Sequence, residues 1–181
     1  MQLIIRALQR SRHLGWANLT FEATKIIDFQ PAGPPDVVLA LHACDTATDE
    51  ALAQAIRWQS TMVFCAPCCH HHLQQQLQGQ QALSPYEPVL RHGVLSERLG
   101  DILTDALRAL ILRIMGYQTE VIQFVSTEHT AKNLMIRAIK SVKPGDARFV
   151  REYRDLKALW RVTPYLEQIL GEDFTLPAPA R

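Results

Sequence analysis

The chain has 181 residues, of which 48% are hydrophobic and 20% are charged, and its formal net charge at neutral pH is +1. This length suffices for one domain with a sizeable core but not for two full domains. No stretch approaches the roughly 20 apolar residues of a membrane span, and the first eight residues are too interrupted for a signal sequence, so we expect a soluble protein.

The N-terminal region is expected to contain a helix, a strand and a loop. Residues 1–12 carry apolar side chains at a helical spacing, and Gly15 follows where such a helix would stop. The apolar residues of Leu19–Ala23 alternate, which predicts a strand. Proline and glycine residues between positions 31 and 35 mark a loop.

Two apolar runs, Val37–Leu41 and Thr61–Cys65, read as short buried strands, and a helical pattern follows each of them. Thr48 is placed to cap the first of these helices. The second helix, within residues 70–81, is rich in glutamine and is expected to be short and exposed. Strands joined through helices run parallel, so the two runs should be adjacent parallel strands.

The second half should begin with a crossing loop over residues 86–93. A strongly periodic helix should follow, capped by Ser96 and closed by Gly116. Thr119–Val125 and Leu134–Ile139 are two strands that must run antiparallel, because a parallel crossover needs a dozen or more residues.

The chain should end in an amphipathic helix over residues 149–160 and a last turn from Thr163 to Gly171. The pattern predicts an α/β fold with a mostly parallel sheet and an antiparallel pair at its C-terminal end. We expect one domain over residues 1–175 and a frayed tail over residues 176–181.

Histidine and cysteine side chains gather where the two parallel strands end. His42, Cys44 and Asp45 follow the first strand, whereas Cys68, Cys69 and His70 follow the second. The carboxyl edge of a parallel sheet is where such folds bind ligands, so these turns form the candidate active site. Three of the four cysteines are packed into residues 65–69, unlike a disulfide framework, which favours a reducing, cytoplasmic setting.

The segments L-H-A-C-D-T-A-T-D-E-A-L (41–52) and A-P-C-C-H-H-H (66–72) resemble motifs of class I S-adenosylmethionine (SAM) methyltransferases. They resemble the methyltransferases related to the acceptor-stem transfer-RNA 2′-O-methyltransferases. They are closer still to a broad methyltransferase-domain family, to which E-H-T-A-K-N-L-M-I-R (128–137) is also similar. The resemblance covers roughly residues 14–170 and implies a partial Rossmann-like sheet with helices on both faces.

The resemblance also implies roles for these residues. His42 would accept the proton of an acceptor hydroxyl, since an imidazole titrates near pH ~6.5. Asp45 would orient His42 or cap a helix. The substrate side of the cleft would be shaped by Cys68, Cys69 and His70. The SAM-facing residues would be Ile26, Ile27 and Leu41.

Two departures from the family pattern affect the cofactor. Asp45 stands where the family turn usually has glycine, and the sequence contains no G-x-G loop. By resemblance, Met1 falls just before the family's third strand, so we expect SAM to bind weakly or not at all. The edge of Val37–Leu41 would then lack a partner strand. We expect that edge to be covered by Leu19–Ala23, by a second copy in a homodimer or by another chain. Otherwise the chain is a truncated product of marginal stability.

Other functions remain open. Residues 132–161 hold nine Lys/Arg against three acids. This local positive charge would suit an RNA methyltransferase, and it would equally suit a non-catalytic module that binds RNA or a protein. The cysteines and histidines of the two turns could bind zinc, but the sequence lacks C-x2-C and adjacent Cys68 and Cys69 rarely face one tetrahedral site, so no metal is expected. A Cys-His hydrolase is disfavoured because no oxyanion-binding loop is visible.

Overall fold

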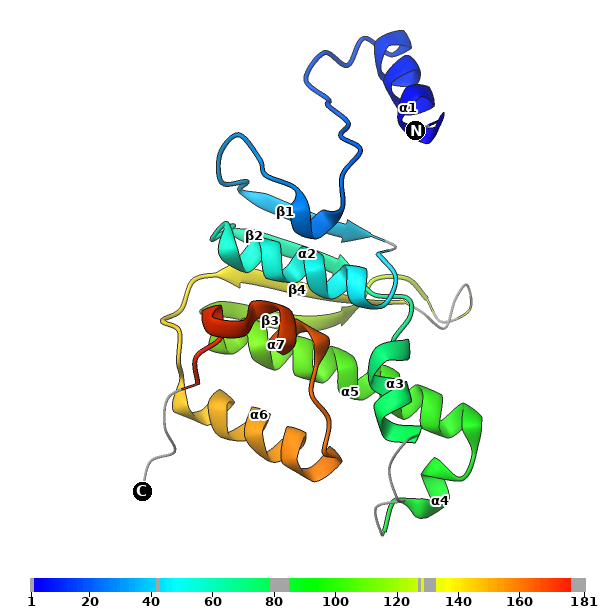
Figure 1. The fold of residues 1–181 in the computed structure, drawn as a ribbon, viewed down its shortest axis with the longest axis vertical. Coiled ribbons are helices and arrows are strands. Elements are labelled where there is room, and N and C mark those ends of the chain that lie inside the picture. The colour runs from blue at the N-terminus through cyan, green and yellow to red at the C-terminus, as the bar shows by residue number, and fades with distance from the viewer. Residues whose placement is uncertain (1, 42, 79–84, 127, 129–132, 177–181) are drawn as a thin grey trace. The chain divides into compact units, whose positions relative to one another are not determined.

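The computed structural model describes residues 2–41, 43–78, 85–126, 128 and 133–176 (Figure 1). The chain divides into two compact units, Met1–Gln30 and Pro31–Arg181. Both candidate turns belong to the second unit.

The N-terminal unit consists of α1 (Gln2–His13), a connecting segment and the short 3-10 helix η1 (Ile26–Asp28). The predicted helix is confirmed, and Gly15 ends it with φ +69° while its N–H donates to the carbonyl of Arg12. The predicted strand Leu19–Ala23 is wrong, because this segment is irregular. Alternation alone does not make a strand, which needs a neighbouring strand for its backbone hydrogen bonds.

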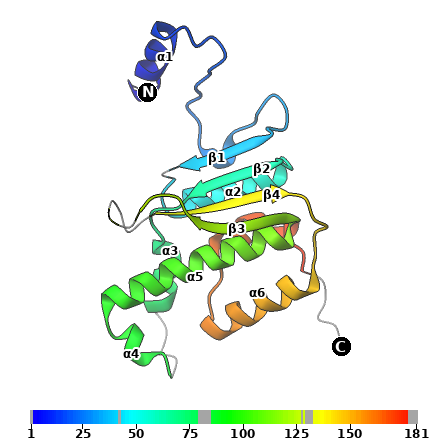
Figure 2. The same ribbon diagram turned by 180° about the vertical axis from the view of Figure 1, so that it is seen from behind.

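The C-terminal unit is built on a four-stranded sheet in the order β1-β2-β4-β3 (Figure 1). Its strands are β1 (Val37–Leu41), β2 (Met62–Ala66), β3 (Tyr117–Gln123) and β4 (Leu134–Lys140). β1 and β2 are parallel, as predicted. β4 lies between β2 and β3 and is antiparallel to both, which Figure 2 shows from behind. The predicted antiparallel pair is therefore also confirmed. The prediction of a mostly parallel sheet is wrong for the described residues, because β4 enters the sheet between β2 and β3 and makes two of the three pairings antiparallel.

Four helices follow β1 and β2, with bounds that differ from the predicted ones. α2 (Thr46–Arg57) begins before Thr48, so Thr48 lies inside the helix and does not cap it. α3 (His71–Gln78) is short, as expected, but it buries Leu73, Gln74 and Leu77. α4 (Glu87–Leu90) replaces the expected crossing loop. α5 (Gly93–Ile114) begins before Ser96, which is buried within it.

The last elements are α6 (Ala147–Trp160), α7 (Tyr165–Leu170) and the 3-10 turn η2 (Gly171–Asp173). The predicted amphipathic helix is confirmed, and the Asp146 side chain caps it by accepting a hydrogen bond from the backbone N–H of Arg148. Pro164 precedes α7 and Gly171 follows it, as the sequence indicated. Of the predicted tail, residues 177–181 lie outside the described residues.

The core lies on one face of the sheet. Val63 and Cys65 of β2 are fully buried and are paired across the sheet with Ala138 and Ile136 of β4. α2 packs on β1, β2 and α7, and α5 packs on β3, β4 and α6; α2 and α7 lie in front of the strands in Figure 1. Side chains alternate between the faces of a strand. On the opposite face of β1, Leu39 is 63% exposed.

Gly116 makes the sharp turn from α5 into β3. Its φ is +95°, and a Cβ atom there would lie 2.9 Å from the carbonyl oxygen of Val142. Glycine is therefore required both by the backbone conformation and by the close approach of the next loop. None of the described helices is both long and apolar enough to cross a membrane.

Candidate active site at the carboxyl edge of the sheet

The register of β1 and β2 brings the two predicted turns to the same edge. Leu41 pairs with Ala66, so the residues after each strand emerge side by side. Cys44 Sγ lies 3.2 Å from Cys68 Sγ, and Cys69 Sγ lies 3.7 Å from Cys68 Sγ. The turns therefore meet through three thiols, whereas His42 lies outside the described residues.

Asp45 connects the two turns. It precedes α2 with φ +51° and ψ −120°, and its own side chain makes no capping bond to α2. Instead, Asp45 Oδ1 accepts a hydrogen bond of 3.1 Å from the backbone N–H of His72, in the first turn of α3. A carboxylate at a helix N-terminus satisfies an unpaired amide and interacts favourably with the helix dipole. This positive φ is a backbone conformation that glycine adopts more readily than other residues.

A buried ion-pair network lies beneath the turns. Arg108 of α5 is 1% exposed and donates to both carboxylate oxygens of Asp49, over 2.8 and 2.7 Å. It also donates to Asp105 Oδ1 at 3.2 Å and to the backbone carbonyl of Asp45 at 3.0 Å. Burial lowers the pKa of Arg108, but Asp49, Asp105 and Cys65 raise it by more, so the guanidinium remains charged. Arg108 thus fixes the first turn against α5.

His70 belongs to the same network. It is 2% exposed, and its Nδ1 and Nε2 each lie 2.9 Å from a carboxylate oxygen of α5, on Asp101 and Asp105 respectively. Burial lowers the pKa of His70, but the adjacent carboxylates of Asp101 and Asp105 outweigh it and leave the pKa raised. The imidazole is therefore engaged on both sides, in an arrangement that positions the second turn.

The thiols differ in their surroundings. Cys65 is fully buried in β2, and burial raises its pKa to about 12. The hydrogen bond with Cys44, burial and the contact with Cys69 raise the pKa of Cys68 to about 12 as well. Since the thiolate is the reactive form, a Cys68 thiol with this raised pKa is a poor nucleophile at neutral pH. This chemistry weighs against a Cys-His hydrolase.

The predicted site residues are thus only partly brought together. Asp45, Cys68 and Cys69 converge, His70 lies buried behind them, and Leu41 is the half-exposed end of β1. The residues expected to face SAM, Ile26 and Ile27, belong to η1 of the N-terminal unit.

Sequence reasoning missed the charges on α5 that support the turns. Asp101, Asp105 and Arg108 recur at intervals of four and three residues along the periodic helix. Residues at this spacing share one face of a helix. Charges on a face that is otherwise apolar were the signal for a buried network.

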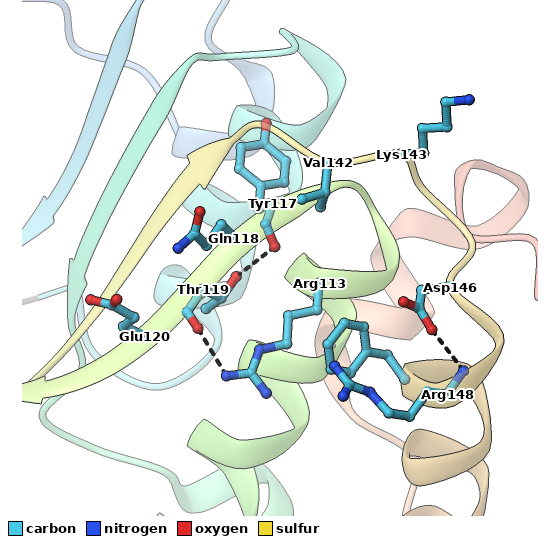
Figure 3. Close-up of a pocket in the computed structure, with 10 residues that line it drawn as sticks. Arg113, Tyr117, Gln118, Thr119, Glu120, Val142, Lys143, Asp146 and Arg148 are labelled. Atoms are coloured by element: carbon cyan, nitrogen blue, oxygen red, sulfur yellow. Dashed lines mark hydrogen bonds between the residues drawn. The ribbon is translucent and has the colours of Figure 1, made fainter.

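A second feature is a pocket at the opposite edge of the sheet, where β3 begins (Figure 3). It has a volume of about 440 Å³ and is lined by residues of α5, β3, the β4–α6 loop and α6. The guanidinium carbons of Arg113 and Arg148 lie 5.2 and 4.4 Å from the centre of the Phe149 ring. Arg113 also donates to the carbonyl of Thr119 at 2.9 Å. This pocket is basic and aromatic.

Comparison with known proteins adds a family relationship for one part of the chain. Residues 1–76, which include both turns, match a family model described as a methyltransferase domain. The match supports a methyltransferase-domain family for this part. A relation to the transfer-RNA 2′-O-methyltransferases remains a prediction.

Curated relatives match over 71 residues, or 39% of this chain. The human "Glutathione S-transferase C-terminal domain-containing protein" is 37% identical over this segment, which is 11% of its length. The mouse protein of the same name is 35% identical, and the Drosophila melanogaster homolog is 39% identical over 12% of its length. The chain therefore matches about a tenth of these relatives. No solved structure matches it.

Proposed function

We propose that this chain forms the acceptor side of a SAM-dependent methyltransferase domain that acts on RNA. The observation that carries the proposal is the meeting of the β1–α2 and β2–α3 turns, within the segment that matches a methyltransferase-domain model. In open α/β sheets, this edge is where ligands bind.

The residues of the turns would position an acceptor hydroxyl and remove its proton. His42 directly follows β1 and is the proposed proton acceptor, a role that contributes about 10²- to 10⁴-fold to a rate. Asp45 holds the two turns together through the His72 amide, so it acts as a positioning residue. His70 would fix the position of the second turn through its contacts with Asp101 and Asp105 of α5.

SAM would supply an activated methyl group, but the chain offers it an incomplete site. The sequence has no G-x-G turn, and among the described residues β1 pairs only with β2. A Gly-rich turn lets the backbone approach a cofactor closely. We therefore propose that the chain by itself binds SAM with a dissociation constant near 1 mM, about −4 kcal/mol.

Calorimetric titration tests this affinity directly. A micromolar or tighter dissociation constant, about −8 kcal/mol, would contradict the incomplete site.

Methyl transfer is then measured with tritiated SAM at millimolar concentration and a pool of transfer RNA. His42→Asn should lower the transfer rate by at least about 10²-fold with unchanged RNA binding. His92→Asn is the matched control, since His92 is exposed and lies outside the turns.

A second candidate is a non-catalytic RNA-binding module, favoured by the pocket of Figure 3. Guanidinium groups flanking an aromatic ring suit phosphates and unstacked bases. Part of the basic excess of residues 132–161 is paired, however, since Lys157 bonds Glu167 and Arg137 bonds Glu120. Salt-dependent RNA binding without methyl transfer, lost in Arg113→Met, would favour this candidate.

A further inference from the structure

We propose that Cys44, Cys68 and Cys69 form a zinc site that ties the β1–α2 turn to the β2–α3 turn. The three Sγ atoms lie within 4.8 Å of one another, with Cys68 Sγ 3.2 Å from Cys44 Sγ and 3.7 Å from Cys69 Sγ. Tetrahedral zinc with Zn–S bonds of about 2.3 Å places its sulfur ligands about 3.8 Å apart. The thiols thus need to move by less than about 1 Å to share one ion.

The structure overturns the reason for expecting no metal here. Adjacent cysteines seldom point into one site, but the Cys69 thiol lies against that of Cys68. Cys44 reaches the same point from a turn 24 residues earlier in the chain. The sequence lacks C-x2-C because the ligands come from two turns of the sheet edge.

The surroundings suit an ion with one open coordination position. Cys44 is exposed, and Cys68 and Cys69 are half-buried, so solvent reaches the cluster. Zinc with three protein ligands keeps its fourth position for water or a substrate atom, whereas a purely structural site has four protein ligands. The proposed ion would therefore bind beside the acceptor while fixing the spacing of the turns.

The supporting hydrogen bonds preform the cluster without the ion. Asp45 binds the amide of His72, and Arg108 binds the carbonyl of Asp45. These contacts lie next to the ligands in sequence and hold both turns to α5. Outer contacts of this kind orient metal ligands and strengthen binding. Loss of zinc should therefore leave the fold intact.

Metal analysis of the purified chain tests the proposal. The protein is kept reduced, incubated with excess Zn²⁺, freed of unbound ion and analysed by mass spectrometry for metals. We expect about one zinc per chain. Cys44→Ser should weaken zinc binding at least about tenfold, as measured by competition with a chromophoric chelator.

Cys65→Ala is the matched control, because Cys65 is buried in β2 outside the cluster. It should keep the zinc stoichiometry of the wild type. Replacement of zinc by Co²⁺ should give thiolate-to-cobalt charge-transfer absorption that Cys44→Ser diminishes and Cys65→Ala retains. Circular dichroism checks that each variant is folded.

Several outcomes would overturn the proposal. These are a wild-type chain without bound zinc under reducing conditions, a Cys44→Ser variant with unchanged affinity, or purified protein that carries copper or iron and cannot exchange it for zinc. A Cys44–Cys68 disulfide that persists in the reduced preparation would do the same. Each readout is independent of methyl transfer, so the zinc site and the proposed function can fail separately.

Discussion

Arg108→Met tests whether the buried network holds the candidate site together. Arg108 makes four hydrogen bonds, three to the carboxylates of Asp49 and Asp105 and one to the carbonyl of Asp45. Methionine fills much of the same space, but it removes the cation that Asp49 pairs with among the described residues and leaves Asp105 with His70 alone. Breaking a buried ion pair in this way costs about 3–5 kcal/mol, so we expect a loss of about 4 kcal/mol in the free energy of unfolding.

Urea denaturation followed by circular dichroism measures this loss. With a slope of about 2 kcal/mol per molar urea, the unfolding midpoint should fall by about 2 M. Arg91→Met is the control, because Arg91 is 67% exposed in its pair with Glu87 and should change stability by no more than about 0.5 kcal/mol. A loss below about 1 kcal/mol in Arg108→Met would refute the view that Arg108 compensates two buried charges.

Further variants test single contacts. Gly116→Ala should lower the free energy of unfolding by about 1–3 kcal/mol, because alanine meets both the positive φ and the Val142 carbonyl; an unchanged urea midpoint would contradict this. Asp45→Gly should be more stable than Asp45→Ala by about 1 kcal/mol in the same assay, since only glycine relieves the φ of +51°. The raised pKa of His70 stabilises the fold fully below the unfolded value near 6.5 and loses this contribution as pH rises through the folded value. Wild-type stability should therefore fall relative to that of His70→Gln as the pH rises above about 6.5, and a constant difference would show that His70 does not titrate. Among the described residues β1 pairs with β2 alone, which predicts dimerisation through its other edge; light scattering over a dilution series would detect the dimer and a Val38→Pro variant would abolish it.

Strong local patterns predicted most of the sheet and its long helices. β1 and β2 are continuous apolar runs followed by helices, and the short connection between β3 and β4 leaves only an antiparallel pairing. α5 and α6 follow from their periodic apolar faces. Leu19–Ala23 failed because a strand depends on a neighbour that the local sequence cannot show.

The candidate site was harder to predict because its contacts join distant positions. Arg108 pairs with Asp49 across 59 residues, and no local period indicates that pairing. Thr48 and Ser96 have side chains that commonly cap helices, yet α2 and α5 begin before them, so both residues lie within the helices. Cys44 meets Cys68 across 24 residues, and the next residue, Asp45, has an unusual backbone where sequence patterns predict a simple helix cap.

The central claim is that the two turns at the carboxyl edge of β1 and β2 form the acceptor side of a methyltransferase site. Its most direct test is an NMR titration of the isotope-labelled chain with S-adenosylhomocysteine and a short acceptor-stem RNA at millimolar concentration. We expect amide shifts centred on residues 43–48 and 67–72, weakened in Asp45→Ala, whose loss of the His72 bond separates the turns. Shifts confined to the pocket around Phe149, or none at either turn, would contradict the claim.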